Sequence, residues 1–138
     1  ICPAITVGNP NLLIERTDKL PYLRLMLKIW EKASPLMIHG DFYALTPNHR
    51  DQTQWTVFQF DDPENGRGLF KVIRNNRCDQ PSLVVAPVGF IDSTDAVYLL
   101  ENPETGESWM TTGRDINQSG LTFTLPIRSG AIWFYKMK

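Results

Sequence analysis

The chain has 138 residues and a formal net charge of −1, from 14 Lys and Arg residues against 15 Asp and Glu residues. Its basic residues are interspersed with acidic ones, which disfavours nucleic acid as a partner. No apolar run approaches the roughly 20 residues of a membrane-spanning helix, and the start lacks the pattern of a signal peptide. The length suits one domain with a real core.

The start of the chain indicates that something precedes it. The first residue is Ile1 rather than methionine, so we expect a piece of a longer protein. Residues 1–16 are apolar but irregular, and we expect them to be the trailing segment of a missing upstream domain. The two cysteines, Cys2 and Cys78, make no disulfide framework. Whether they pair, and in which compartment the protein works, stays open.

Residues 17–36 carry the strong helical pattern of the chain and are predicted to form a connecting helix. Its apolar stripe repeats with the helical period and is expected to pack on the outer face of the following domain. This stripe consists of Leu20, Leu23, Leu27 and Trp30. Met26 and Ile29 widen the apolar face. The helix is predicted to end at Ser34-Pro35, because the residue before a proline is pushed out of the helical region.

Residues 37–138 predict about eight strands separated by turns. The predicted strands are 40–45, 54–60, 68–74, 82–88, 97–101, 108–111, 121–125 and 130–136. Asn65-Gly66 is a hairpin signal. Strict alternation places Leu121, Phe123 and Leu125 on one face and the intervening threonines on the other. The fold class is therefore mainly β, an antiparallel β-sandwich of Greek-key type preceded by one N-terminal α-helix.

Several predicted strands are apolar on both faces. Trp55 and Val57 point to one side of their strand, and Phe58 and Phe60 point to the other. Antiparallel sheets usually leave one face in contact with water. The sequence therefore indicates that part of one sheet is covered on its outer face by the helix or by a missing neighbour.

The order of these pieces resembles the C-terminal β-sandwich domain of glycoside hydrolase family 36, the α-galactosidases. The similar pieces run from Tyr22 to the end of the chain: LRLMLKIWEKASPLM leading into HGDFYAL, QWTVFQF, ENGRGLFKVIR, DAVYLLENPETGESWMTTGRDINQSGLTFTLP and the closing GAIWFYK. The order of the pieces is specific for this family, whereas each piece alone is weak evidence for it.

The resemblance implies an activity for a parent protein and none for this chain. In these enzymes two aspartates on a catalytic barrel act as nucleophile and acid/base, and retaining hydrolysis needs carboxyl groups about 5–5.5 Å apart. No stretch here matches the barrel motifs. The expected function is a non-catalytic accessory domain, residues 37–138, that caps or stabilises the barrel of the same parent chain. No cofactor is expected, and self-association of the piece is left open.

The acidic cluster Asp61, Asp62 and Glu64 allows two interpretations. As a carboxylate pair it would be catalytic, but Asp, Pro and Asn are also the residues that hairpin turns favour. The turn is the preferred interpretation. His39 and His49 are too few for a metal site, which needs three or four ligands. Cys78 lies in a polar segment and is expected to be an exposed thiol.

The aromatic residues support an alternative function. Exposed aromatic rings stack against sugars in carbohydrate-binding domains, and Tyr98 with Trp109 on one hairpin is the candidate platform. Core packing remains the preferred interpretation, since large aromatic side chains mostly bury themselves. A carbohydrate-binding module is therefore the second hypothesis, and an enzyme with its own site is the third.

Overall fold

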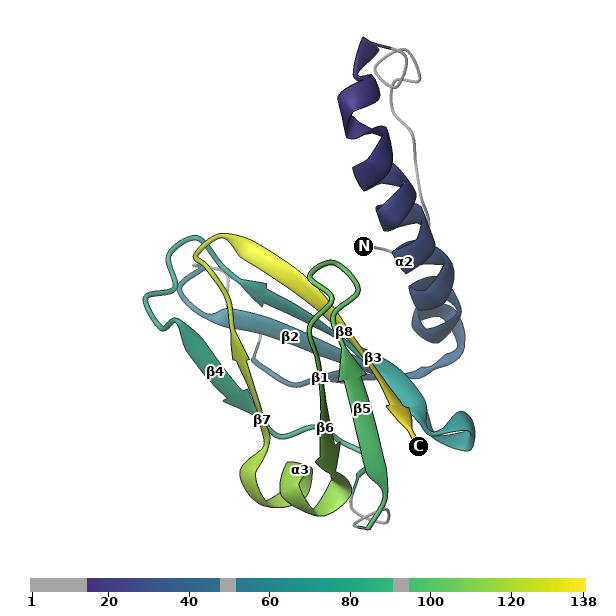
Figure 1. Cartoon of the computed structure of the whole chain (residues 1–138). Coiled ribbons are helices and arrows are strands. Elements are labelled where there is room, and N and C mark those ends of the chain that lie inside the picture. Colours follow the sequence, from purple (N-terminus) through teal and green to yellow (C-terminus); the bar gives the residue numbers. More distant parts are fainter. Residues whose placement is uncertain (1–14, 48–51, 91–94) are drawn as a thin grey trace.

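The computed structural model describes residues 15–47, 52–90 and 95–138, and these form a β-sandwich with a long helix at one side (Figure 1). The helical elements are η1 (Thr17–Lys19), α2 (Leu20–His39), η2 (Pro63–Asn65) and α3 (Gly113–Ser119). The strands are β1 (Asp41–Ala44), β2 (Trp55–Asp62), β3 (Arg67–Arg74), β4 (Ser82–Val85), β5 (Val97–Glu101), β6 (Ser108–Thr112), β7 (Leu121–Thr124) and β8 (Ser129–Met137).

The strands form two antiparallel sheets of unequal size. The main sheet has six strands in the order β1-β2-β3-β8-β5-β6, and the small sheet pairs β4 with β7. The last strand, β8, lies in the middle of the main sheet between β3 and β5. The predicted mainly β sandwich with an N-terminal helix is confirmed.

The core lies between the two sheets. Phe70 and Val72 of β3 are fully buried on the inner face of the main sheet, and Phe123 of β7 covers them from the small sheet. The rings of Phe70 and Phe123 are 5.8 Å apart. Leu121 and Phe123 are buried, Leu125 packs partly buried against the same cluster, and the intervening threonines are exposed. The predicted facing of these residues is confirmed.

Helix α2 covers the outer face of the main sheet through its C-terminal half. Ile29, Ala33 and Leu36 are buried there against Leu69 and Phe134. The predicted contact stripe of Leu20, Leu23, Leu27 and Trp30 is therefore wrong, and Leu27 keeps 37% of its surface exposed. The physical reason is that this helix has two apolar sides, and helical periodicity does not indicate which of them meets the sheet.

The predicted end of the helix at Ser34-Pro35 is also wrong, because α2 continues through Pro35 to His39. Proline cannot donate a backbone hydrogen bond, so its place inside a helix has a cost. Pro35 lies on the exposed side of the helix, whereas Ser34 and Leu36 beside it are buried. Packing of Leu36 outweighs the lost bond, and the amide of Gly40 closes the helix on the Leu36 carbonyl at 2.9 Å.

The short helix α3 was not predicted. Thr112 precedes it, and its hydroxyl oxygen accepts a hydrogen bond from the amide of Asp115 at 3.1 Å. This is an N-cap, which stabilises a helix start. Ile116 anchors α3 in the core with 2% exposure. Within the described ranges, no helix has the length and apolar character to cross a membrane.

Phe123→Ala tests the packing between the sheets. Phe123 is 2% exposed, and truncating a buried phenylalanine typically lowers the free energy of unfolding by about 3–5 kcal/mol. We expect a loss of this size in urea denaturation.

The matched control is the exposed neighbour Thr122→Ala, which changes only strand propensity and should cost less than about 1 kcal/mol. Similar losses in both variants would contradict the assignment of Phe123 to the core.

Candidate functional site

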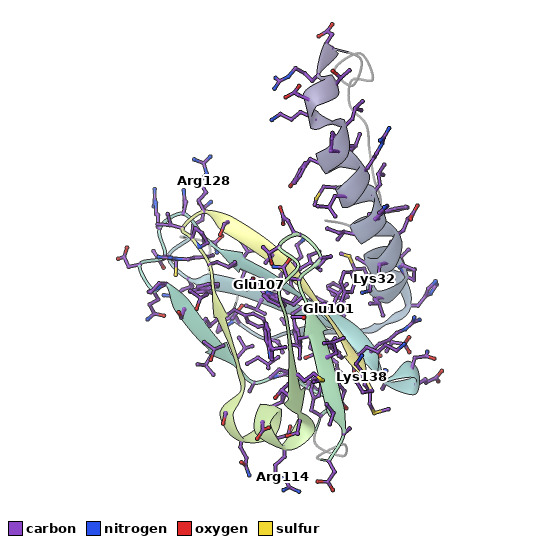
Figure 2. All side chains as sticks on the ribbon, viewed as in Figure 1. Lys32, Glu101, Glu107, Arg114, Arg128 and Lys138 are labelled. Carbon is purple, nitrogen blue, oxygen red and sulfur yellow. The ribbon has the colours of Figure 1, made fainter. Side chains whose placement is uncertain are left out.

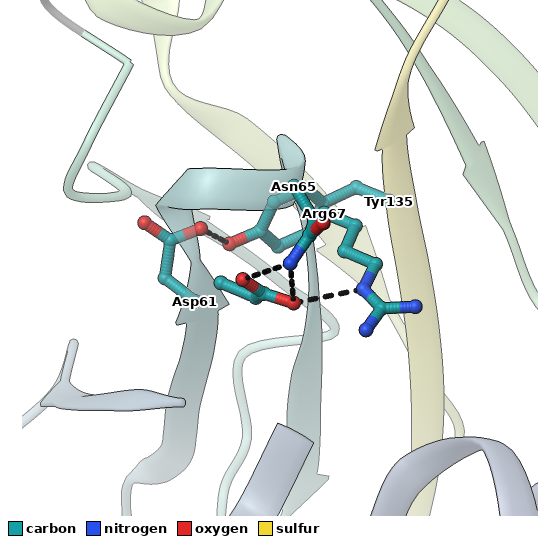
Figure 3. A network of polar contacts seen from close by, with 5 residues as sticks. Asp61, Asn65, Arg67 and Tyr135 are labelled. Atoms are coloured by element: carbon teal, nitrogen blue, oxygen red, sulfur yellow. Dashed lines mark hydrogen bonds and ion pairs between the residues drawn. The ribbon is translucent and has the colours of Figure 1, made fainter. Parts of the chain in front are cut away.

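A polar row crosses the inner face of the main sheet near the end of β2. The strand register places Asp61 of β2 opposite Gly68 of β3, and Gly68 opposite Tyr135 of β8. A Cβ atom on Gly68 would collide with the hydroxyl of Tyr135 and the carbonyl of Phe60. Glycine at this position therefore leaves the space through which the tyrosine reaches the aspartate (Figure 3).

The row continues into a chain of hydrogen bonds. The Tyr135 hydroxyl donates to Oδ1 of Asp61 at 2.5 Å and accepts from Nε2 of Gln59 at 3.1 Å. Nε2 of Gln59 also donates to the Val88 carbonyl at 2.8 Å, and Oε1 of Gln59 accepts from the Val88 amide at 2.9 Å. The amide of Gln59 thus holds the segment after β4 against the main sheet.

Burial changes the acid–base properties of this network. Loss of hydration raises the pKa of Asp61, and the negative charges of Asp41 and Asp62 raise it further, against the opposing effect of the Tyr135 hydrogen bond. Burial, together with the neighbouring Asp61, also raises the pKa of Tyr135 well above its ordinary value. The phenol therefore stays a hydrogen-bond donor across the physiological pH range.

Asp62 has a different environment from its neighbour, because successive residues of a strand point to opposite faces. Its carboxylate accepts hydrogen bonds from Nδ2 of Asn65 and, at 2.9 Å, from Nε of Arg67 (Figure 3). These bonds lower the pKa of Asp62. Gly66 closes the turn with a φ of 56°, a backbone conformation that suits glycine.

The two aspartates have separate partners. Asp61 bonds Tyr135 on the inner side of the sheet, and Asp62 bonds Arg67 on the other side, which argues against a paired catalytic role for them. Glu64 lies exposed in η2, within the hairpin turn. The turn interpretation of the acidic cluster therefore holds for Glu64, whereas Asp61 and Asp62 are the last two residues of strand β2. Sequence reasoning missed the inward Asp61, although the alternation from Trp55 and Val57 through Gln59 places it there.

Of the metal and thiol candidates, the structure describes His39 and Cys78. His39 ends α2, and His49 lies outside the described residues. No group of three metal-ligating side chains occurs in the described part of the chain. The expectation of an exposed Cys78 is wrong, because Cys78 is 1% exposed. Arg74 donates to the Cys78 carbonyl at 2.9 Å and folds the segment inward. Cys2 lies outside the described residues, so the pairing question stays open.

The two sugar-stacking candidates, Tyr98 and Trp109, both face the core. Tyr98 is 4% exposed, and its ring meets that of Phe90 edge-on at 4.8 Å. Trp109 is partly buried, and its ring lies 4.5 Å from that of Trp133. The contacts of both rings with the core favour core packing. Sugar stacking by this pair stays a prediction.

The N-terminal half of α2 carries apolar surface that the sandwich does not use. Tyr22 is 55% exposed and Leu27 is 37% exposed. Nε1 of Trp30 is buried and has no hydrogen-bond partner among the described residues. Where the helix meets the sheet, Met26 and Ile29 line a groove of about 310 Å³ together with Ile132 of β8. The side of α2 that carries Tyr22, Leu23 and Leu27 is called the free helix side below.

The architecture is that of a β-sandwich domain with an N-terminal helix. No family model matches the sequence, and no curated protein matches it. Among the solved structures that share the fold are the galactosidase domain of the α-galactosidase–sucrose kinase AgaSK and the glycoside hydrolase family 36 α-galactosidase AgaB from Geobacillus stearothermophilus. The TM-scores are 0.63 and 0.64, each at 18% identity, over 85% and 89% of this chain.

The comparison confirms the predicted resemblance at the level of fold. The chain spans only 16% of the length of either α-galactosidase chain, which is the share that one domain of a larger protein occupies. At this identity the similarity establishes the fold alone, and the activity of those enzymes belongs to them.

Asp61→Asn tests the buried carboxyl. Because the pKa of Asp61 is raised on folding, the native state binds this proton more tightly than the unfolded chain. The stabilisation is complete below the unfolded pKa of about 3.9 and is lost as the pH rises through the folded pKa. We expect the unfolding free energy of the wild type, relative to the variant, to fall as the pH rises from 4 to 8.

Asp62→Asn is the matched control, with the opposite sign. The pKa of Asp62 is lowered on folding, so its stabilisation is present above the unfolded pKa and is lost as the pH falls through the folded pKa. Urea denaturation across the pH range measures both differences. Equal slopes for the two variants would contradict the assigned environments.

Proposed function

We propose that this chain is the non-catalytic C-terminal accessory domain of an α-galactosidase-like glycoside hydrolase, and that it caps and stabilises the catalytic barrel of the same parent protein. In this proposal residues 1–16 are the trailing segment of the barrel, and residues 37–138 form the accessory sandwich. Residues 17–36 are the helix that connects the two. The observation that carries the proposal is the free helix side of α2, which has apolar surface and no partner within the described sandwich.

The contacts of α2 support a role in joining two bodies. Its C-terminal half is fixed to the sandwich by Ile29, Ala33 and Leu36. Its N-terminal half leaves Tyr22 and Leu27 exposed. Covering such surface stabilises an interface by roughly 25 cal/mol for each Å² of apolar area removed from water. A barrel that packs on this half of α2 would hold the sandwich in a fixed orientation.

The chemistry of the sandwich supports a non-catalytic role. The buried carboxyl of Asp61 is bonded to Tyr135, and that of Asp62 to Arg67 on the opposite face. The candidate sugar platform, Tyr98 and Trp109, is turned into the core. A carbohydrate-binding module therefore remains the second hypothesis without an observation that favours it.

The first test of this proposal is an activity assay. We expect the purified 138-residue chain to hydrolyse neither nitrophenyl α-galactoside nor a panel of other glycosides, because the described carboxylates form no catalytic pair. An intact family 36 α-galactosidase serves as the positive control. Turnover clearly above that of a heat-denatured sample would refute the accessory-domain assignment.

The second test concerns the free helix side. Without a barrel, this apolar surface should be covered by a second copy of the chain, because exposed apolar patches of several hundred Å² favour association. We expect concentration-dependent dimerisation in sedimentation velocity, abolished in the double variant Leu23→Asp/Leu27→Asp.

The matched control for this test is Met110→Asp on β6, a residue that is 68% exposed and lies away from α2. It should leave dimerisation unchanged. If the wild-type chain stays monomeric at all concentrations, or if the dimers persist in the helix variant, the free helix side no longer supports the capping proposal.

A further inference from the structure

A second cavity lies on the other side of α2, between the C-terminal half of the helix and the outer face of the main sheet. Its volume is about 460 Å³. Leu36 of α2, Phe134 of β8 and Leu99 of β5 contribute apolar surface to its floor. A volume of a few hundred Å³ with an apolar lining is typical of sites for small molecules.

The rim of this cavity is strongly basic. Lys32, Arg67, Lys136 and Lys138 line it, and Glu101 is the acidic residue in the same lining. Lys32, Glu101 and Lys138 gather on the side of the sandwich next to the lower half of α2 (Figure 2). The whole chain carries a formal net charge of −1, so four cations around one cavity are a local concentration. This cavity is called the basic pocket below.

Two of the cations face each other directly. Arg67 of β3 and Lys136 of β8 are register partners on neighbouring antiparallel strands, on the outer face of the main sheet. Like charges in directly opposite positions destabilise a sheet. A negative charge between them would convert this repulsion into two attractive contacts.

The protein's own carboxylates neutralise only part of the rim. Asp62 holds Nε of Arg67 at 2.9 Å, and Glu101 lies 3.7 Å from Nζ of Lys32. The Lys32 ammonium also lies 4.2 Å from the centre of the Phe134 ring, over the floor. Among the described residues, no ion pair forms with Lys136 or Lys138. After both ion pairs are counted, the rim keeps an excess of positive charge.

We propose that the basic pocket binds a small organic phosphate, a site that is independent of barrel capping. A phosphate monoester is close to a dianion at neutral pH and presents several acceptor oxygens. Arginine and lysine side chains bind such groups through charge-assisted hydrogen bonds. Arg67 and Lys136 hold the phosphate, and the apolar floor formed by Leu36, Leu99 and Phe134 contacts the organic part of the ligand.

The shape of the pocket favours a small molecule over an acidic protein or a nucleic acid. The charges surround one concave volume between a helix and a sheet, whereas a polyanion needs an extended basic surface. The apolar floor adds a reason for an organic ligand rather than a free inorganic ion, because covering it contributes binding energy that the ion alone does not gain.

Titration of the 138-residue chain with glucose 6-phosphate, followed by amide chemical shifts at constant ionic strength, tests the proposal. We expect saturable shifts at Arg67, Lys136 and Leu99, and none with neutral glucose. Lys136→Gln should weaken binding by about tenfold, the effect of losing one charge-assisted hydrogen bond. Lys28→Gln makes the same chemical change on the exposed surface of α2 and should leave the affinity unchanged.

Thermal unfolding gives a second readout in the same variants. Lys136→Gln removes the like-charge pair, so its midpoint without ligand should equal or exceed that of the wild type. Glucose 6-phosphate should raise the wild-type midpoint more than that of the variant, because a ligand stabilises the state that binds it. This comparison separates loss of binding from loss of folding.

Three results would overturn the proposal. Shifts that do not saturate, or that sodium sulfate reproduces at equal ionic strength, would show general screening of charge. Equal affinities for inorganic phosphate and glucose 6-phosphate would remove the role of the apolar floor. Tighter binding of an acidic hexapeptide than of glucose 6-phosphate would assign the pocket to a protein partner. None of these results bears on the accessory-domain proposal, which the assay and the sedimentation experiment test separately.

Discussion

A buried hydrogen-bond chain from Asp61 through Tyr135 to Gln59 ties the strands of the main sheet to the segment that follows β4. This chain joins β2 to β8 across the glycine of β3, and the amide of Gln59 fixes the backbone at Val88. The small sheet is joined to the main sheet by that segment, and Phe90 within it packs against Tyr135 with ring centres 5.3 Å apart. Buried polar groups specify a unique packing only when each has its partner. Here one aspartate, one tyrosine and one glutamine meet that condition together.

The same strands carry a second, unrelated set of contacts on the outer face of the main sheet. Leu69 and Phe134 contact the C-terminal half of α2. Beyond them, Arg67 and Lys136 line the basic pocket. The inner face therefore holds the sandwich together, and the outer face carries the helix and the basic residues. Because β3 and β8 contribute to both, the packing of the core also sets the positions of the charged residues on the outside.

Strand positions, turns and facing followed from the sequence, because period-two alternation and turn residues are local properties. The alternation through Leu121 and Phe123 correctly indicated the buried side. The wrong predictions for α2 and Asp61 concern tertiary packing, which local sequence patterns do not contain. The helix has two apolar sides. Contact with the sheet decides that the side with Ile29 and Ala33 is the buried one. Its passage through Pro35 depends on burial of Leu36, which no local rule contains. The inward Asp61 obeyed the alternation, yet turn preference drew the interpretation toward a surface loop.

The place of β8 in the sheet order has a consequence for biosynthesis. The strand that comes last in the sandwich lies at its centre, between β3 and β5. During synthesis, β5 and β6 therefore emerge before the strand that joins them to β1, β2 and β3 exists. Helix α2 is already present to cover part of the outer face of the β2–β3 hairpin, but the edge of β3 that pairs with β8 is still open. Contacts between distant parts of a chain form slowly, and uncovered strand edges are prone to aggregation in the meantime. Until β8 is made, the edge of β3 that it later covers stays open.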